Sequence, residues 1–317
     1  MIDNRDHYRQ LTNEDSSIPI FAKSWWLDAV AGEHWNVSLA VHGDTIQAAL
    51  PYTTRRRAGR LILGQPQLTQ FLGPWFKPAP GKAAARLARQ KDLMFELVDG
   101  LPTFAQYAQN WNPDITNWLP FHWKGFDQTT RYTYALTDLK DADKLWSGLQ
   151  ANARTDIRKA SQRFSVRLRE EPVLDDFIRL HEQTFARQNK SSPYSQALIH
   201  KLDAACAEHD CRKIFIAEDE EGRAHAAAYV VWDGQTAYYL MGGGDPDLRN
   251  SGATSYCLWE AIQFASTIVD RFDFEGSMIE PIERFFRSFG ALQLPYFRVS
   301  KTPSRLLKFR AALRTIL

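Results

Sequence analysis

Residues 238–290 constrain the fold of this 317-residue chain more than any other segment. Their pattern predicts a strand over 238–241, a turn of three glycines at 242–244, an apolar helix after residue 254, a strand over 272–274 and a helix over 282–290. Small residues before a helix leave its first N–H groups and its positive dipole end accessible. Such a turn suits an anionic or thioester-bearing ligand.

Length and composition indicate a globular protein with two domains. Domains run to roughly 100–200 residues, so 317 residues predict two of them. A hydrophobic content of 44% with 24% charged residues is typical of soluble globular chains. No apolar run approaches the roughly 20 residues of a membrane span, and the polar N-terminus lacks a signal-peptide core. We therefore expect a cytoplasmic protein.

The cysteine and charge patterns limit the kinds of ligand that this chain is expected to bind. The chain has three cysteines, Cys206, Cys211 and Cys257; an odd number without the spacing of a disulfide framework favours reduced thiols. No second cluster of metal ligands follows Cys206 and Cys211, so we expect no metal site. The net charge is only +2, but basic residues gather at 55–60, at 154–169 and over 284–317. These clusters are either solvated faces or sites for an anion such as a CoA diphosphate, a nucleotide sugar, RNA or a lipid surface. We do not expect DNA binding.

The first half predicts an aromatic, strand-rich domain over 1–140. Its expected elements are helices over 23–30 and 81–98, a hairpin of 35–41 with 46–52, and strands over 115–119 and 132–136. A single long helix over 141–163 is expected to connect the two domains, and we place the boundary there.

The second half predicts the element order β-α-α-β-β-β-α-β-α-β over 141–300. After the connector come a strand at 166–169, helices over 175–188 and 195–208, and strands over 213–218, 225–232 and 236–241, with the final strand at 295–299. An amphipathic helix over 301–317 follows, capped by Thr302 and Pro303. It either packs on the first domain or lies on a membrane surface.

This order is the order of the GNAT acyltransferase fold, and several segments resemble FemAB-like double-GNAT transferases, which include the BioF2-like acetyltransferase group. The segments that carry the resemblance are 152–160, 166–168, 242–243, 258–262, 272–276 and 285–290. The resemblance implies a mixed-sheet α/β fold of tandem GNAT-like domains, the first degenerate. Family members transfer either amino acids from charged tRNA or acyl groups from CoA.

The resemblance also implies a donor loop after the strand at 236–241. GNAT enzymes hold the CoA pyrophosphate with a Gln/Arg-x-x-Gly-x-Gly/Ala loop, and here Thr254 stands in the last small position. That departure puts tight pyrophosphate contact in doubt. The expected donor-binding residues are Met241, Gly242, Gly243, Arg249, Ser251, Gly252, Ala253 and Thr254. No tightly bound cofactor is expected, with acyl-CoA as the co-substrate.

Acyl transfer to an amine needs a polarised carbonyl and a proton acceptor. Side chains alternate along the strand at 272–275, so Asp273 and Glu275 share the face opposite Phe272 and Phe274. If the two phenylalanines face the core, both carboxylates face the cleft and are candidate catalytic residues. Glu275 is our first choice for the base, beside the alternative of a structural carboxylate that holds a turn. Tyr239 is a candidate to protonate the leaving thiolate, unless it is core packing.

Acceptor binding is predicted from Asn152 of the family-like connector segment and from basic and aromatic residues. The alternative roles of the basic and aromatic residues are a solvated helix face and core packing. These residues are Asn152, Arg154, Arg158, Lys159, Trp75 and Arg287. The leading hypothesis is N-acyl transfer from acyl-CoA to an amine of a cell-envelope or polysaccharide precursor. The alternatives are transfer from aminoacyl-tRNA to a peptidoglycan-type precursor, and a non-catalytic protein that binds an anionic ligand.

Overall fold

The computed structural model describes residues 3–276 and 278–303. Contacts divide the chain into two compact units, the first made of residues 1–131 and 295–317 and the second of residues 132–294. The expected boundary at residues 140 and 141 thus falls inside the second unit, and the chain returns to the first unit at Pro295. Most of the helix predicted over 301–317 falls at residues 304–317, outside the described residues.

The first unit is built on a mixed sheet in the order β1-β2-β3-β5-β12, in which only the β3–β5 pair is parallel. Its strands are β1 (Trp35–His42), β2 (Thr45–Arg57), β3 (Arg60–Gly64), β5 (Gln106–Asn110) and β12 (Leu292–Lys301), with β4 (Trp75–Phe76) beside β2. Its helices are α1 (Asn4–Glu14), η1 (Ile20–Ala22), α2 (Ser24–Ala31), α3 (Ala83–Asp99) and α4 (Leu119–Trp123).

Among the described residues, hydrophobic clusters connect the helices of the first unit to its sheet. One joins α1 and α2 to β1 through Tyr8, Leu27 and Trp35, and another joins α3 to the sheet through Met94 and Leu97. The predicted hairpin of 35–41 with 46–52 is confirmed by the β1–β2 pairing. The strand predicted over 115–119 is wrong. Residues 115–118 form neither a strand nor a helix, and α4 begins at Leu119, where Pro120 suits the first turn and the Asn117 side chain accepts the Leu119 N–H.

The second unit confirms the predicted element order through its final helix. Its helices are α5 (Ala142–Gly148), α6 (Ala151–Arg163), α7 (Leu174–Ala186), α8 (Gln196–Glu208), η2 (Arg249–Ser251), α9 (Ala253–Ile268) and α10 (Glu280–Arg287). Its strands are β6 (Asp127–Thr137), β7 (Arg167–Leu168), β8 (Arg212–Glu218), β9 (Ala224–Trp232), β10 (Thr236–Gly244) and β11 (Arg271–Asp273). The sheet order is β6-β11-β10-β9-β8-β7, and only β10 and β11 are parallel neighbours.

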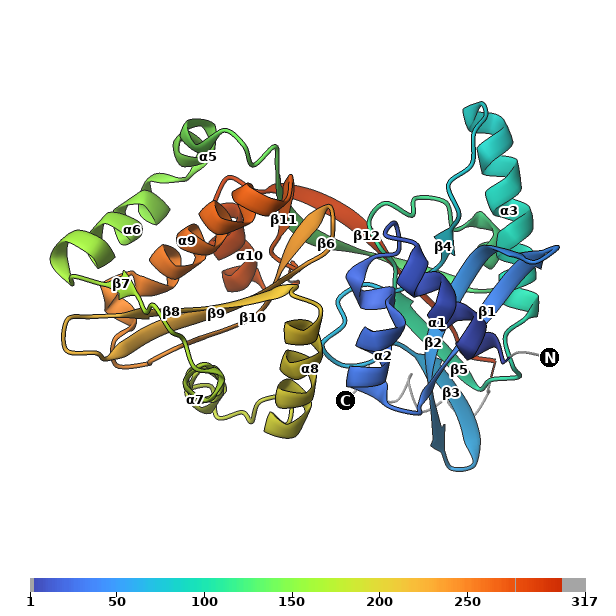
Figure 1. Ribbon diagram of the computed structural model, residues 1–317, viewed down its shortest axis with the longest axis horizontal. Helices are drawn as coiled ribbons and strands as arrows, with labels where there is room; N and C mark the ends of the chain where they lie inside the picture. The colour runs from blue at the N-terminus through green and yellow to red at the C-terminus, as the bar shows by residue number, and fades with distance from the viewer. Residues whose placement is uncertain (1–2, 277, 304–317) are drawn as a thin grey trace. The chain divides into compact units, whose positions relative to one another are not determined.

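Helices cover both faces of this second sheet, as Figure 1 shows. α6, α9 and α10 lie on one face, and α7 and α8 lie on the other. The main core fills the space between α9 and the sheet, and its members include Cys257, Leu258 and Ile262 of α9 together with Phe272 and Phe274. Both phenylalanines are fully buried, which confirms that they face the core. The last strand, β12, pairs with β5 over residues 298–301, and β6 takes the place beside β11.

Two local predictions in the second unit are wrong. The predicted single helix over 141–163 is two helices. The backbone is extended at Leu149, and the Gln150 N–H donates to the Ser288 carbonyl instead of to a carbonyl of the preceding helical turn. The glycines 242–244 are not a turn but the end of β10, paired with Ala226–228 of β9. Small residues on both strands leave room for a helix to press on the sheet at this point.

Candidate functional site

β10 and β11 separate after a short stretch of parallel pairing. Only Thr236, Ala237 and Tyr238 pair with β11, whereas β10 continues to Gly244 with β9 as its partner. A bulge between Tyr239 and Met241 shifts the register where the two strands separate. Strand pairing with β11 therefore leaves the edge of β10 over 239–244 open, as expected for a splayed pair.

Helix α7 lies against this open part of β10. A Cβ placed on Gly243 would stand 2.5 Å from the carbonyl carbon of Leu180 and 2.8 Å from the Cα of His181. No side chain fits at that distance, so glycine is required by the close approach of the helix backbone.

Two side chains of α7 bind the backbone of the open edge. The Nδ1 atom of His181 donates to the Gly242 carbonyl at 2.8 Å, and the Gly244 N–H donates to the Thr184 hydroxyl at 3.0 Å. These groups point away from β9. Since the N–H and C=O of one residue in an antiparallel strand point to the same side, the Gly242 N–H faces the same open edge.

The ring of His181 is buried and held in one tautomer. A carbonyl only accepts, so Nδ1 carries the proton and Nε2 is the acceptor nitrogen. Nε2 is buried, and no residue within 3–276 or 278–303 gives it a hydrogen-bond partner. Burial lowers the pKa of His181, although the bond to Gly242 opposes the shift, so the ring is neutral at neutral pH.

Glu275 and Asp273 lie together at the end of β11, in different roles. Asp273 is almost fully buried and accepts hydrogen bonds from the Thr133 hydroxyl and the Glu275 N–H, so it holds the turn that follows β11. Glu275 is partly buried with a φ of 59°, an uncommon backbone conformation for a non-glycine residue. Burial, followed by the neighbouring Asp273 charge, raises the pKa of Glu275 well above its usual value.

Tyr194, in the loop between α7 and α8, connects these two parts of the site. Its ring stacks nearly parallel to the ring of His181, with 6.2 Å between centroids. Burial and then the Glu275 charge raise the pKa of Tyr194 to about 12. The open edge of β10, the face of α7 and the end of β11 therefore meet around His181, Tyr194 and Glu275.

Tyr239 lies on the opposite face of β10. Its hydroxyl stands where a Cβ of Gly242 would be, and its ring meets Phe286 edge-on at 6.1 Å. Burial raises the pKa of Tyr239, so its hydroxyl is protonated at neutral pH. The residue both packs on the core and places a hydroxyl beside Gly242.

The predicted donor loop forms the short helix η2 and the start of α9. Gly252 has a φ of 83°, and a Cβ there would collide with the Asp156 carbonyl of α6, so only glycine fits. The Ser251 hydroxyl accepts the Ala253 N–H at 3.3 Å. Ser251 and Ala253 are buried, whereas Arg249 and Thr254 are exposed beside the first turn of α9. Met241 is buried in β10.

The connector residues predicted to bind the acceptor have contacts within their own unit. Arg154 donates to the Ser147 carbonyl at 3.2 Å and to the Leu149 carbonyl, so it caps the end of α5. Arg158 stacks over Trp146 at 5.4 Å and Lys159 over Phe164 at 5.8 Å. Asn152 is exposed on α6.

Replacing Arg154 with alanine is expected to lower the free energy of unfolding by about 1–2 kcal/mol, because two carbonyls at the break between α5 and α6 lose a charged donor. Arg158→Ala, which removes the same charge one turn along but only an exposed ring contact, is the control and should cost less than about 1 kcal/mol. Urea denaturation of both variants measures the difference. Equal losses would contradict a capping role for Arg154.

The two remaining predicted acceptor residues lie apart from this cluster. Trp75 is buried in the first unit, where its indole N–H donates to the Ser17 hydroxyl at 3.1 Å. Arg287 is half exposed at the end of α10 and donates to Glu283 at 2.8 Å. Among the described residues, no three potential ligands gather as a metal site would need. All three cysteines are buried free thiols.

The sequence predictions omitted His181, Thr184 and Tyr194. A signal for the first two was present, because His181 and Thr184 interrupt the apolar stripe that Phe177 and Leu180 make along α7. A polar pair on the buried side of a helix needs partners, and the backbone of β10 supplies them. Nothing in the local sequence marks Tyr194.

Comparison with known proteins agrees with this geometry. Residues 148–281 match the acetyltransferase (GNAT) domain family. This part of the chain is therefore a GNAT acyltransferase domain, and the chain is an acyltransferase. No curated protein sequence matches the chain.

Solved structures with a similar fold span nearly the whole chain. The crystal structure of FemX is 11% identical, covers 94% of this chain and 96% of its own, and has a TM-score of 0.68. A domain from Agrobacterium fabrum, assigned as the C-terminal domain of a lysylphosphatidylglycerol synthetase, is 12% identical, covers 98% and 97%, and has a TM-score of 0.61. L-PGS from Bacillus licheniformis is 11% identical, covers 98% and 96%, and has a TM-score of 0.56. At this identity the likeness shows the fold alone.

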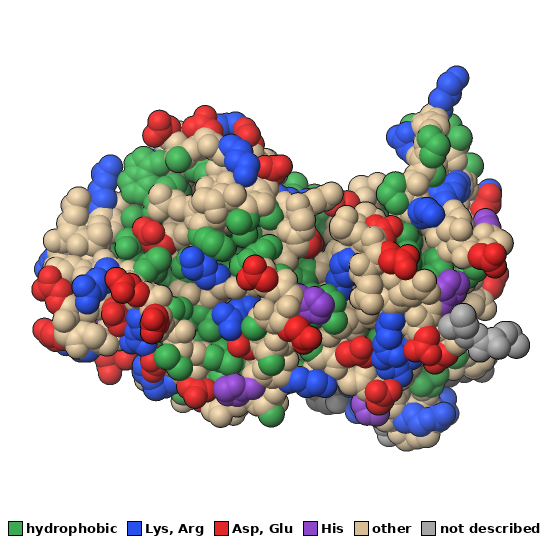
Figure 2. Space-filling model, in the orientation of Figure 1, with side chains coloured by type: hydrophobic (Ala, Val, Ile, Leu, Met, Phe, Trp, Pro, Cys, Tyr) green, Lys and Arg blue, Asp and Glu red, His purple; other side chains and the backbone are tan. Residues whose placement is uncertain are grey.

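Two further observations concern the charge of the surface and the search for membrane-spanning helices. On the face drawn in Figure 2, acidic and basic side chains are interspersed rather than gathered into one basic field. None of the helices in the described ranges combines the length and the apolarity that crossing a lipid bilayer demands.

Proposed function

We propose that this protein transfers an acyl group from acyl-CoA to a primary amine of a cell-envelope or polysaccharide precursor. The observation that carries the proposal is the separation of β10 from β11 after Tyr238, beside a helix that begins at a left-handed glycine. The open edge offers a backbone N–H to a substrate carbonyl, and the helix start offers N–H groups to an anionic arm of the donor. An acyl-CoA donor places the reaction in the cytoplasm.

The residues around the open edge support a direct transfer. The Gly242 N–H polarises the thioester carbonyl, the amine nitrogen bonds to the carbonyl carbon, and the carbon–sulfur bond breaks. Glu275 accepts the proton that the amine loses, and the Tyr239 hydroxyl supplies a proton to the leaving sulfur. His181 fixes the Gly242 peptide through its bond to the carbonyl, so it acts as a positioning residue.

The small residues and the positive charge at the start of α9 suit the binding of a diphosphate. Gly252 and Ala253 keep the helix start free of bulk, and the exposed Arg249 and the Thr254 hydroxyl lie beside the first-turn N–H groups. The Ala253 N–H is already bonded to Ser251, so the donors that remain are those of the next residues in the turn.

A second candidate, transfer from an aminoacyl ester such as aminoacyl-tRNA, is favoured by one observation. The pantetheine arm of CoA carries amides that would extend along a strand edge, but His181 and Thr184 already bond the Gly242 carbonyl and the Gly244 N–H. A donor without such an arm needs neither group. The precursor would then be of the peptidoglycan type.

Thermal unfolding with a series of acyl-CoAs separates the two candidates. A ligand that binds only the folded state adds about 2.7 kcal/mol at 100 times its Kd. We expect one acyl-CoA to raise the Tm, with a smaller rise in an Arg249→Ala variant and none with free adenosine diphosphate. The absence of any rise at millimolar acyl-CoA would reject the thioester donor and favour the aminoacyl ester.

A further inference from the structure

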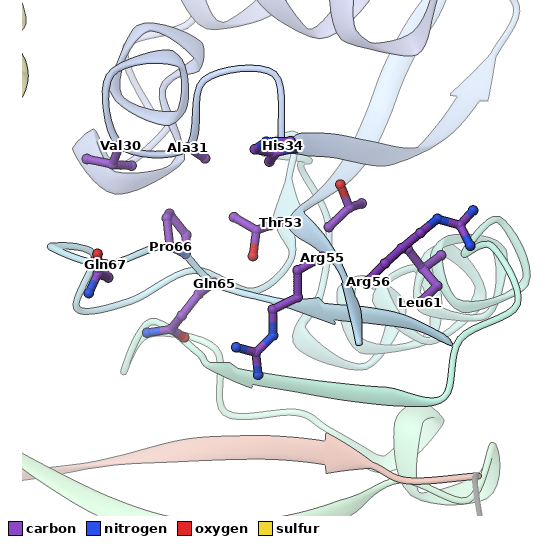
Figure 3. Close-up of a pocket in the computed structure, with 11 residues that line it drawn as sticks. Val30, Ala31, His34, Thr53, Arg55, Arg56, Leu61, Gln65, Pro66 and Gln67 are labelled. Carbon is purple, nitrogen blue, oxygen red and sulfur yellow. The ribbon is translucent and has the colours of Figure 1, made fainter. Parts of the chain in front are cut away.

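The first unit contains a hollow of about 820 Å³ at the end of β2, which Figure 3 shows with its lining side chains as sticks. The stretch from the end of α2 to the start of β1 forms one wall, with Val30, Ala31 and His34. The loop over 65–67 forms the facing wall, and Thr53 and Arg55 of β2 lie between the two. Every lining residue belongs to the first unit.

The charge of this hollow is positive. Arg55 and Arg56 line it, and none of the lining residues that the structure describes is acidic. Within residues 3–276 and 278–303, neither guanidinium is paired with a carboxylate. Arg56 donates one hydrogen bond to the Gly59 carbonyl at 3.1 Å. Side chains alternate along a strand, so Arg55 shares the face of Thr53, and Figure 3 shows both pointing to the side of Gln65. Arg56 lies at the rim beside Leu61.

The walls of the hollow are fixed by hydrogen bonds. Gln65 donates to the Thr69 carbonyl at 2.9 Å and accepts the Asn110 N–H at 2.5 Å, so its side chain is locked. The Thr54 N–H donates to the His34 carbonyl at 2.8 Å and ties the opposite wall to β2. A site that is ordered before binding loses less entropy when a ligand enters.

We propose that this pocket binds a phosphate ester whose organic group is apolar or planar. The guanidinium of Arg55 presents a fork of donors that matches phosphate oxygens, and the Thr53 hydroxyl lies on the same face. Val30, Ala31 and Pro66 supply the apolar surface for the organic group. The volume lies within the roughly 300–1,000 Å³ of small-molecule sites, so phosphate alone would fill a small part of it.

The proposal is independent of the proposed acyl transfer, because no lining residue falls within the matched GNAT residues 148–281. Calorimetric titration of the full chain with 1-naphthyl phosphate, inorganic phosphate and 1-naphthol tests it. Naphthyl phosphate should bind at least roughly tenfold more tightly than either fragment, since it uses both parts of the pocket. Equal affinity for naphthyl phosphate and naphthol would overturn the proposal.

Paired variants test the site itself. Arg55→Ala should weaken naphthyl phosphate binding by roughly tenfold or more. Arg57→Ala removes the same charge two residues along β2, from an exposed side chain outside the pocket, and should change binding less than about twofold. Val30→Thr should weaken naphthyl phosphate and leave inorganic phosphate unchanged. Equal losses in the two arginine variants would mean non-specific charge attraction and would overturn the assignment.

A phosphate ester of this kind can come from a soluble metabolite or from a lipid headgroup. Vesicles of phosphatidylcholine with and without phosphatidic acid distinguish the two sources once naphthyl phosphate binding is established. Displacement of naphthyl phosphate by the acidic vesicles alone assigns a lipid headgroup, and its retention assigns a soluble ester.

Discussion

Glu275→Gln is expected to lower kcat by roughly 100- to 10,000-fold, the range that a general base contributes. The substitution keeps the size of the side chain and removes only the group that takes the proton from the amine. Steady-state release of free CoA thiol, followed with a saturating acyl-CoA and an amine acceptor, measures the effect. The KM for acyl-CoA should change little, because Glu275 does not lie on the donor loop.

The pH dependence separates a base from a structural carboxylate. Burial and the Asp273 charge raise the pKa of Glu275, so the carboxyl is protonated at low pH and kcat/KM should rise with pH through that raised pKa. Glu275→Gln should lack this rise. Residual activity that keeps the wild-type pH profile would show that another group takes the proton.

Stability gives the control for folding of the same variant. The pKa of Glu275 is higher in the folded state than in the unfolded state, so its protonated form contributes to the free energy of unfolding. This contribution is fully present below pH 4.5, the ordinary pKa, and is lost as the pH rises through the raised pKa of the folded state. A neutral glutamine carries no such loss. At pH 8, Glu275→Gln should therefore be at least as stable as the wild type in urea denaturation, and a large loss would mean that Glu275 holds the turn.

Gly243→Ala is expected to lower the free energy of unfolding by about 1–3 kcal/mol and to lower activity at the same time. The added Cβ would stand 2.5 Å from the Leu180 carbonyl carbon, so α7 must move away from β10. That movement shifts His181 and the Gly242 peptide, and a displacement of about 1 Å can cost 100-fold in rate.

Gly234→Ala is the matched control, because a Cβ there meets nothing within 4 Å and the residue has no positive φ. It should change the free energy of unfolding by less than about 0.5 kcal/mol and leave kcat unchanged. Chemical denaturation and the thiol-release assay apply to both variants. A Gly243→Ala protein with wild-type stability and rate would contradict the close packing of α7 on β10.

The sequence predicted what depends on local periodicity. Alternation along 272–275 correctly placed Phe272 and Phe274 in the core, and turn chemistry predicted β8 and β9 to within one residue of their ends, whereas β10 runs three residues further than predicted. The order of elements followed from the same signals, and the mixed sheet with a GNAT domain is confirmed. The assignments of Glu275, Asp273 and Tyr239 to catalysis stay predictions.

The failures depend on contacts that are distant in sequence. The glycines at 242–244 suggest a turn by themselves, but the Tyr239 side chain comes so close to Gly242, and α7 so close to Gly243, that the strand needs glycine at both positions. The helix over 141–163 has continuous helical spacing, and its break follows from a bond between Gln150 and Ser288, far along the chain. His181 was missed for the same reason, since its partner Gly242 lies 61 residues away.

The most direct test is transfer of a labelled acyl group from acyl-CoA to amine acceptors, with the products identified by mass spectrometry. The acceptors would be amino sugars, nucleotide-linked amino sugars and amino acids, and the Glu275→Gln protein would run in parallel. Our account predicts a labelled amide with at least one acceptor, formed by the wild type and strongly reduced in the variant. Label that stays on CoA with every acceptor, while an aminoacyl ester donates to the same acceptors, would contradict it.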